Sequence, residues 1–235
     1  MPGIRLSTLR RRRGPSDRGA AAVEFALVFP LVLVLTFGII EFAQLLRDYV
    51  GVSQVVRDSV RTASAAPQKG ATGSLTNIRA GHAGTASPTS FAYDASQVLA
   101  STGTAIPKSS IVDLWVYLAN AKGFPLAAGT APSAWRTDTS SSFTSCPVAT
   151  CVRYAWEPDP DGTGPLEATF DYRSGDWNPA SINACAGKPE AMAVGVFMRV
   201  RHNGPLSSLF GTGFDVSDSS VLKFEPLRNV NCQGT

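Results

Sequence analysis

The longest apolar run of the chain extends from residue 20 to residue 40. Its 21 residues include one charged side chain, Glu24, and one proline, Pro30. A helix that crosses a membrane needs about 20 mainly apolar residues. The run directly follows a basic segment, as membrane spans commonly do. The pattern therefore predicts a transmembrane helix in preference to a buried core helix.

Beyond this run, apolar residues recur at every third or fourth position up to residue 63, which is the spacing of an amphipathic helix. No proline occurs between Pro30 and Pro67. We therefore expect one helix from about residue 20 to residue 66, transmembrane in its first half and amphipathic in its second. The side chains expected to pack against neighbouring helices or the rest of the chain are Phe25, Phe42, Leu45, Tyr49 and Val56.

The chain changes character after residue 66. Residues 67–90 consist largely of Gly, Ser, Thr, Ala and Pro without an apolar period, which predicts a linker. A short helix is expected near residues 94–101. Runs rich in β-branched and aromatic residues then predict strands at residues 111–118, 152–156, 168–172, 191–200 and 221–224. The expected fold class is α+β, a long N-terminal helix followed by a small, mainly antiparallel β head over residues 91–235.

The positive charge of the chain is confined to its amino terminus. The whole chain has a net charge of +3. Residues 1–19 hold six arginines and one aspartate, a net charge of +5, whereas residues 20–235 hold 15 basic and 17 acidic side chains, a net charge of −2. Basic residues beside a span favour the cytoplasmic side, so we expect a cytoplasmic leader and a head outside the cytoplasm. The head has no basic cluster, and a nucleic-acid partner is not expected.

All four cysteines lie in the expected head. An even number of cysteines outside the cytoplasm suits two disulfides. Three pairings are possible, and we favour the local pair first. The favoured pairs are Cys146 with Cys151 and Cys185 with Cys232. The chain has only two histidines and no CxxC motif, so neither a metal site nor a cofactor is expected.

Glu24 is the most informative single residue, because an ionisable group in a membrane span is costly and points to a function. It is the fifth residue after Gly19, which ends the basic segment, and Phe25 follows it. This order resembles the cleavage signal of type IV pilin-like proteins, and the aromatic residue after the glutamate is similar to the Flp/Tad branch. The stretch of residues 19–27, together with residues 38–42, resembles the TadE-like pseudopilin family. Residues 219–226, which end in Glu-Pro, resemble its closing strand.

The resemblance implies a pilin-like fold and the role of a minor pseudopilin, a structural component that helps to assemble a Tad-type pilus used in adherence or secretion. The protein would not be an enzyme. A prepilin peptidase would cleave between Gly19 and Ala20, and Glu24 would assist processing or meet the new amino group on a neighbouring subunit. The implied partners are the cytoplasmic membrane, the peptidase and other Tad or Flp pilins or pseudopilins, bound through the N-terminal helix. The chain would be a single-pass protein of the cytoplasmic membrane or pilus-associated.

Two other interpretations stay open. The protein could be a membrane-anchored extracellular binding protein unrelated to pili, with the apolar helix as a tether. It could also be a tethered hydrolase that uses His82 or His202, although no Gly-x-Ser-x-Gly motif is present. We expect His202 to be a surface or strand-end residue.

Two further groups of side chains are weighed in the head. The acidic cluster of Glu157, Asp159, Asp161 and Glu167 lacks the spacing of an EF-hand, so a solvated turn is expected there. Among the tryptophans, we expect Trp115 and Trp156 in the core and Trp135 and Trp177 as exposed contacts.

Overall fold

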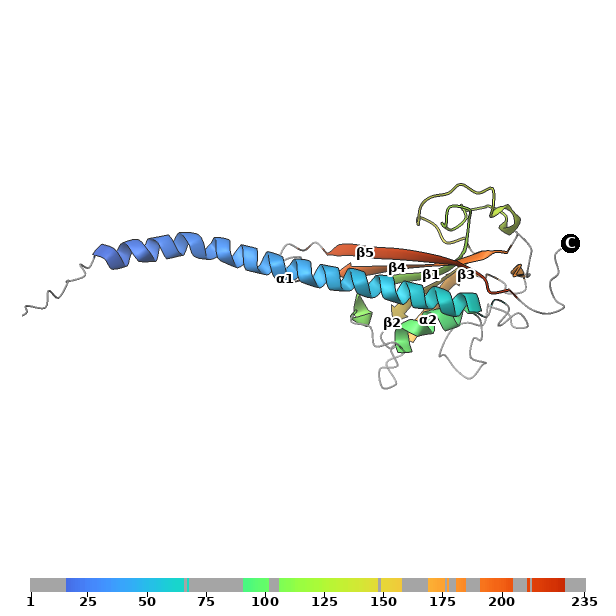
Figure 1. Cartoon of the computed structure of the whole chain (residues 1–235), viewed down its shortest axis with the longest axis horizontal. Coiled ribbons are helices and arrows are strands. Elements are labelled where there is room, and N and C mark those ends of the chain that lie inside the picture. Colours follow the sequence, from blue (N-terminus) through green and yellow to red (C-terminus); the bar gives the residue numbers. More distant parts are fainter. Residues whose placement is uncertain are drawn as a thin grey trace, which may run out of the picture. The chain divides into compact units, whose positions relative to one another are not determined.

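The chain forms one long helix and a five-stranded sheet with short accompanying helices (Figure 1). The computed structural model describes residues 16–65, 67, 91–101, 106–147, 149–157, 169–175, 177, 181–184, 191–204, 211 and 213–226. The elements are α1 (Ser16–Ala65), α2 (Phe91–Ser101), η2 (Lys108–Ser110), β1 (Ile111–Ala119), η3 (Pro132–Ala134), β2 (Cys151–Glu157), β3 (Thr169–Gly175), β4 (Ala193–His202) and β5 (Phe214–Lys223). The predicted α+β class is confirmed.

The chain divides into two compact units, residues 1–43 and residues 44–235. The described part of the first unit is the amino-terminal stretch of α1, in which every side chain from Gly19 to Phe37 is exposed. In the part of the chain that the structure describes, α1 is the one helix long and apolar enough to cross a membrane, with a mean hydropathy of 2.5 over its most apolar window. Exposed side chains of this kind are stable in lipid rather than in water.

The second unit is built on the sheet, whose strands lie in the order β3-β2-β1-β4-β5. Every neighbouring pair is antiparallel. β1 therefore lies at the centre of the sheet, between β2 and β4, and β4 lies between β1 and β5. These interior positions explain why the sequences of β1 and β4 are almost continuously apolar. A strand buried on both faces has no polar side to alternate with.

One face of the sheet packs against the second half of α1 and against α2. The helix contributes Val52, Val55, Val56, Val60 and Ala63, all buried. On the central strand the side chains that point to this face are Leu114, Val116 and Leu118. Their spacing of two in the strand and of three to four in the helix is the spacing that each element needs to present a single apolar face.

The opposite face is covered in part by the loop of residues 120–147, which Figure 1 shows on the side of the sheet away from α2. Phe143 of the loop stacks on Phe197 of β4, with ring centroids 4.2 Å apart. Beneath them lie Trp115 and Tyr117, in a second apolar cluster separate from the helix-side core. Tyr117 fits because its partner in β4 is Gly195, where a Cβ atom would lie 2.2 Å from the tyrosine ring.

The end of the sheet closes back onto the helices. After β5, Phe224 is buried beside Phe91 of α2 and Trp177, with T-shaped ring contacts at 5.0–5.9 Å among the three. The backbone N–H of Glu225 then donates to the carbonyl of Ser64 in the last turn of α1, at 2.9 Å. This bond satisfies one of the carbonyls that a helix end leaves without an intrahelical partner.

Three predictions about the head need correction. Trp177, expected to be exposed, is 1% exposed, and Trp135 is partly buried against the helix-side core. Both predictions relied on the neighbouring Pro and Ser residues, which are typical of exposed loops. Residues of a loop can nevertheless fold over an apolar core. β5 begins seven residues before the predicted strand, at Phe214, because residues 214–220 are mostly polar and acquire their extended form by pairing with β4. Trp115 is buried as predicted.

Candidate functional site

The start of α1 presents Gly19 and Ala20 on an open helical surface. Both residues are exposed, and a Cβ atom added at Gly19 would have no neighbour within 4 Å. Glycine in a helix costs about 1 kcal/mol relative to alanine. Since the described structure has no steric need for this glycine, the fold itself does not account for it.

Glu24 follows one turn later and is also exposed. It is the single charged residue between residues 20 and 40. Within the described residues it has no ion pair and no hydrogen bond from a side chain. The only hydroxyl of this segment, by contrast, is satisfied internally, because Thr36 donates to the carbonyl of Val32 at 2.8 Å. Among the described residues of the apolar segment, Glu24 is thus the one strongly polar side chain for which no hydrogen bond or ion pair within the chain offsets the cost of leaving water.

The expected packing residues separate into two groups. Val56 is fully buried in the helix-side core, and Leu45 packs against its edge. Phe42 and Tyr49 are 60% and 52% exposed, and Phe25 is exposed and stacks on Phe29. The head therefore covers the second half of the amphipathic segment and leaves Phe42 and Tyr49 uncovered.

A close contact between a carboxylate and an imidazole joins α1 to the end of β4. His202, the last residue of β4, is 3% exposed, and its Nδ1 lies 2.7 Å from Oδ2 of Asp48. His202 ends strand β4, which is one of the two positions expected for it, and its side chain is buried rather than at the surface. Even-numbered residues of β4 face the helix, so Asp48, on the sheet-facing side of α1, meets the imidazole.

An open pocket of about 370 Å³ lies beside this pair. It is polar, and residues from α1, η2 and β4 meet there. Its lining consists of Gln44, Arg47, Asp48, Pro107, Ser109, Ser110, Arg201, His202 and Asn203. Sequence reasoning missed the pocket, although Asp48 carries a signal: it is a carboxylate between Leu45 and Val52, on the helix face that packs against the head.

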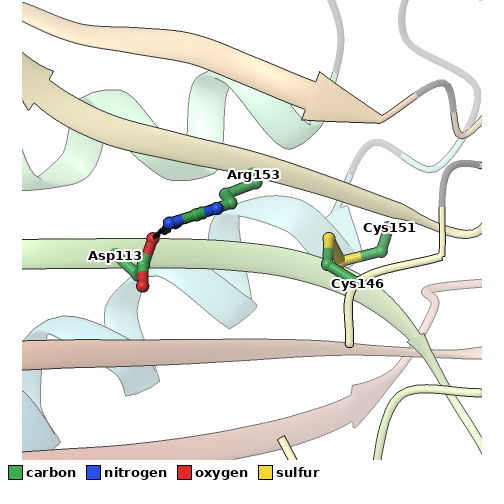
Figure 2. The surroundings of a disulfide bond; sticks show 4 residues. All are labelled: Asp113, Cys146, Cys151 and Arg153. Atoms are coloured by element: carbon green, nitrogen blue, oxygen red, sulfur yellow. Dashed lines mark hydrogen bonds and ion pairs between the residues drawn. A yellow bond between two sulfur atoms is a disulfide. The ribbon is translucent and has the colours of Figure 1, made fainter. Parts of the chain in front are cut away.

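The opposite face of the sheet holds a second charged cluster. Asp113 of β1 is buried, and its two carboxylate oxygens accept hydrogen bonds from Arg153 of β2 and Arg199 of β4. Figure 2 shows Arg153 reaching Asp113 across the two strands. Two guanidinium groups on one carboxylate satisfy its lone pairs, as a buried charge requires.

The disulfide between Cys146 and Cys151 joins the end of the 120–147 loop to the start of β2 (Figure 2). It is the favoured local pair. Cys185 and Cys232 lie outside the described residues, as do the 68–90 part of the predicted linker and Asp159, Asp161 and Glu167 of the acidic cluster.

Asp138 organises the base of the same loop. It accepts hydrogen bonds from the backbone N–H groups of Ala127 and Ser140 and from the Asn120 amide. Desolvation raises the pKa of Asp138, but these hydrogen bonds outweigh it and lower the pKa to about 2. Loop and sheet are therefore joined by a covalent bond at one end and a polar network at the other.

Neither charged cluster forms a metal centre. Across the described ranges, no three His, Cys, Asp or Glu side chains come close enough together to hold a metal ion. The arrangement is that of a head that packs on its own helix, with an apolar helical segment left uncovered ahead of it.

Comparison with known proteins gives one match. Residues 19–61 match the family described as TadE-like protein, a family associated with the Tad pilus. No curated protein and no solved structure matches the chain. The match covers the apolar segment and most of the amphipathic half of α1. Residues 19–61 are thus similar to the TadE-like family, as the resemblance in this segment predicted.

Proposed function

We propose that the protein is a minor pseudopilin that helps to assemble a Tad-type pilus used in adherence or secretion. A prepilin peptidase removes the first 19 residues, and the mature chain begins at Ala20. The observation that carries the proposal is the family match, which begins at Gly19. The apolar segment anchors the chain in the cytoplasmic membrane, with the arginine-rich leader in the cytoplasm and the head outside.

The surroundings of Gly19 support this processing step. The glycine lies in the fourth position of α1 with open space around it. The first turn of a helix lacks part of its backbone hydrogen bonds and frays most easily. A peptidase can therefore reach this bond without disturbing the head, which begins to pack on the helix more than 20 residues later.

Glu24 supports a role in assembly. After cleavage, Ala20 carries a free amino group four residues before the glutamate. An amino group and a carboxylate in a low-dielectric medium offset each other's desolvation cost when they pair. Glu24 of one subunit and the amino terminus of another would thus set the axial register between neighbouring helices, and the exposed Phe25, Phe42 and Tyr49 would supply apolar contacts.

A matched pair of glycine variants tests the proposal. Gly38 is a second glycine of α1 whose Cβ position has nothing within 4 Å. In cells that also express a prepilin peptidase, Gly19→Val is expected to retain the leader and Gly38→Val to lose it, as judged by intact mass. Equal processing of both variants would show that Gly19 is not the recognised residue. Glu24→Gln tests the axial register between neighbouring helices, and Glu41→Gln is its control. The incorporation of each variant into pili is the readout.

A further inference from the structure

Strand β5 forms one edge of the sheet, since β4 is its one neighbour among the described strands. All 10 residues of β5 pair with β4 in an unbroken register. An edge strand presents backbone N–H and C=O groups that can pair with a strand of another chain, and natural proteins protect such edges with bulges, prolines or charged side chains. The residues of β5 include no proline, and its register with β4 has no bulge.

The pairing with β4 determines which backbone groups of β5 face outwards. Directly after the strand, the N–H of Phe224 donates to the carbonyl of Met192 at 3.1 Å. Because the backbone groups of successive residues point to opposite sides of a strand, the even-numbered residues of β5 bond to β4 and the odd-numbered residues face the free edge. The N–H of Glu225 agrees with this alternation, since it donates to Ser64 of α1. The outward residues of β5 are Asp215, Ser217, Ser219, Val221 and Lys223.

A neighbouring side chain blocks the middle of this outward row. The carboxylate of Asp218 accepts a hydrogen bond from the backbone N–H of Ser219, with N and Oδ1 2.8 Å apart. A strand that added to this edge would have to displace the carboxylate from the N–H. It would also have to take part of the hydration from a charged group, which is costly without a new partner. Asp218 thus closes the edge at its midpoint.

The sequence of β5 is complementary to a second copy of itself in antiparallel orientation. If two β5 strands pair around their midpoints, Asp215 lies opposite Lys223 of the second copy, and Val216 lies opposite Leu222. Opposite charges and apolar pairs in such positions stabilise a sheet. The lysine would join an existing exposed ion pair, because Asp215 also contacts Arg201 of its own copy at 3.0 Å.

The same register is unfavourable for Asp218. The Asp218 side chains of the two copies would lie on one face in diagonal positions, about 7–8 Å apart. Like charges at this separation repel each other. The residue opposite Asp218 in β4 is Met198, which brings no compensating charge. One carboxylate therefore opposes a pairing that the ends of the strand favour.

We propose that β5 is a self-complementary edge that Asp218 keeps closed, so that the heads of separate copies do not join into one continuous sheet. The strand that the opened edge takes is β5 of a second copy, antiparallel to the first. Loss of Asp218 would thus turn a head that does not pair through β5 into one that does. The proposal concerns the sheet alone and is independent of cleavage at Gly19.

The test uses the full chain in detergent micelles and compares Asp218→Ala and Asp218→Thr with the wild type. Asp58→Ala is the control, because it removes an exposed carboxylate of α1 instead of one in the sheet. Amide hydrogen exchange of residues 214–223 is measured by NMR at low and at high protein concentration, and the oligomeric mass is measured by light scattering. The outward amides of Ser217 and Val221 report edge pairing, and association through α1 alone would not protect them.

In both Asp218 variants we expect a dimer and exchange at Ser217 and Val221 that slows by about tenfold as the concentration rises. In the wild type and the control, both amides should exchange fast at every concentration. Adding Ser217→Pro to Asp218→Ala removes an outward N–H, a position where an edge strand tolerates proline, and should restore fast exchange at Val221. Fast exchange in both Asp218 variants, protection in the wild type, or protection that persists after the proline substitution would overturn the proposal.

Discussion

Asp48 and His202 are 154 positions apart in the sequence, yet their side chains meet at 2.7 Å and join helix α1 to strand β4. Replacing Asp48 by alanine removes the carboxylate that faces the His202 imidazole. The His202 side chain, which would lose this partner, is almost fully buried. Loss of a hydrogen bond in a buried site costs about 1–3 kcal/mol. We expect Asp48→Ala to lower the free energy of unfolding by that amount.

All four tryptophans lie in the head, so urea unfolding of the full chain in detergent can be followed by tryptophan fluorescence. Asp58→Ala is the matched control, because Asp58 is an exposed carboxylate on the same helix, 3.7 Å from Arg61. A surface pair of this kind contributes about 0–1 kcal/mol. Equal losses in the two variants would show that the contact to His202 does not stabilise the head.

We expect the replacement of Asp113 to destabilise the head more than the replacement of Asp215 does. Asp113→Ala would leave Arg153 and Arg199 facing each other without the buried charge between them. Removing one partner of a buried ion pair costs about 3–5 kcal/mol. Asp215→Ala removes the partner of Arg201 in an exposed pair, and about 1 kcal/mol or less is expected there. Comparable urea midpoints for the two variants would contradict this ranking.

Gly195 is expected to tolerate no side chain. A methyl group there would enter the ring of Tyr117, and the ring cannot move freely because its hydroxyl donates to the carbonyl of Gly123 at 2.9 Å. Overpacking of a core costs about 1–3 kcal/mol. Gly195→Ala should lower the melting temperature of the head, whereas Gly19→Ala should leave it unchanged. An unchanged melting temperature for Gly195→Ala would refute the packing that we describe.

Asp138 makes the stability of the loop of residues 120–147 dependent on pH. Its pKa is lowered from 3.8 to about 2 in the folded head. A lowered carboxyl pKa stabilises the fold above the unfolded pKa, and the contribution is lost as the pH falls from about 4 towards 2. Asp138→Asn should therefore lose less stability than the wild type between pH 4 and pH 2. Parallel stability curves in this window would contradict the role of the Asp138 hydrogen bonds.

The Cys146–Cys151 bond closes a short loop, with a sequence separation of 5. The chain-entropy relation gives about 2 kcal/mol for a ring of this size. Replacing both cysteines by alanine should cost that amount and increase the solvent exposure of Phe143, which stacks on Phe197. Hydrogen exchange of residues 141–147 would report the loosened loop, and unchanged protection would show that the aromatic stack holds it alone.

Much of the fold could be predicted from the sequence where one physical requirement acts over many residues. The apolar run and the three-to-four spacing predicted α1, and the apolar strands predicted β1 and β4. The polar start of β5 could not be predicted in this way, because its extended form comes from backbone pairing with β4 at the sheet edge. Trp177 shows the same limit, since its burial depends on Phe91 and Phe224, which are distant in sequence.

The site was predictable to a similar degree. Gly19, Ala20 and Glu24 could be proposed as site residues from the sequence because their spacing is local. The pocket beside His202 could not, because α1, η2 and β4 meet only in the folded chain. The one local signal was Asp48, a charged residue on the buried side of an amphipathic helix, where an unpaired carboxylate would be destabilising.

The amino terminus of the mature protein is the most direct test of the central claim. The full chain is expressed with an active prepilin peptidase and, separately, with a catalytically inactive one, and the membrane-bound product is analysed by intact mass and amino-terminal sequencing. A chain that begins at Ala20 only with the active peptidase is the predicted result. A chain that keeps residues 1–19 in the presence of the active enzyme would contradict the claim.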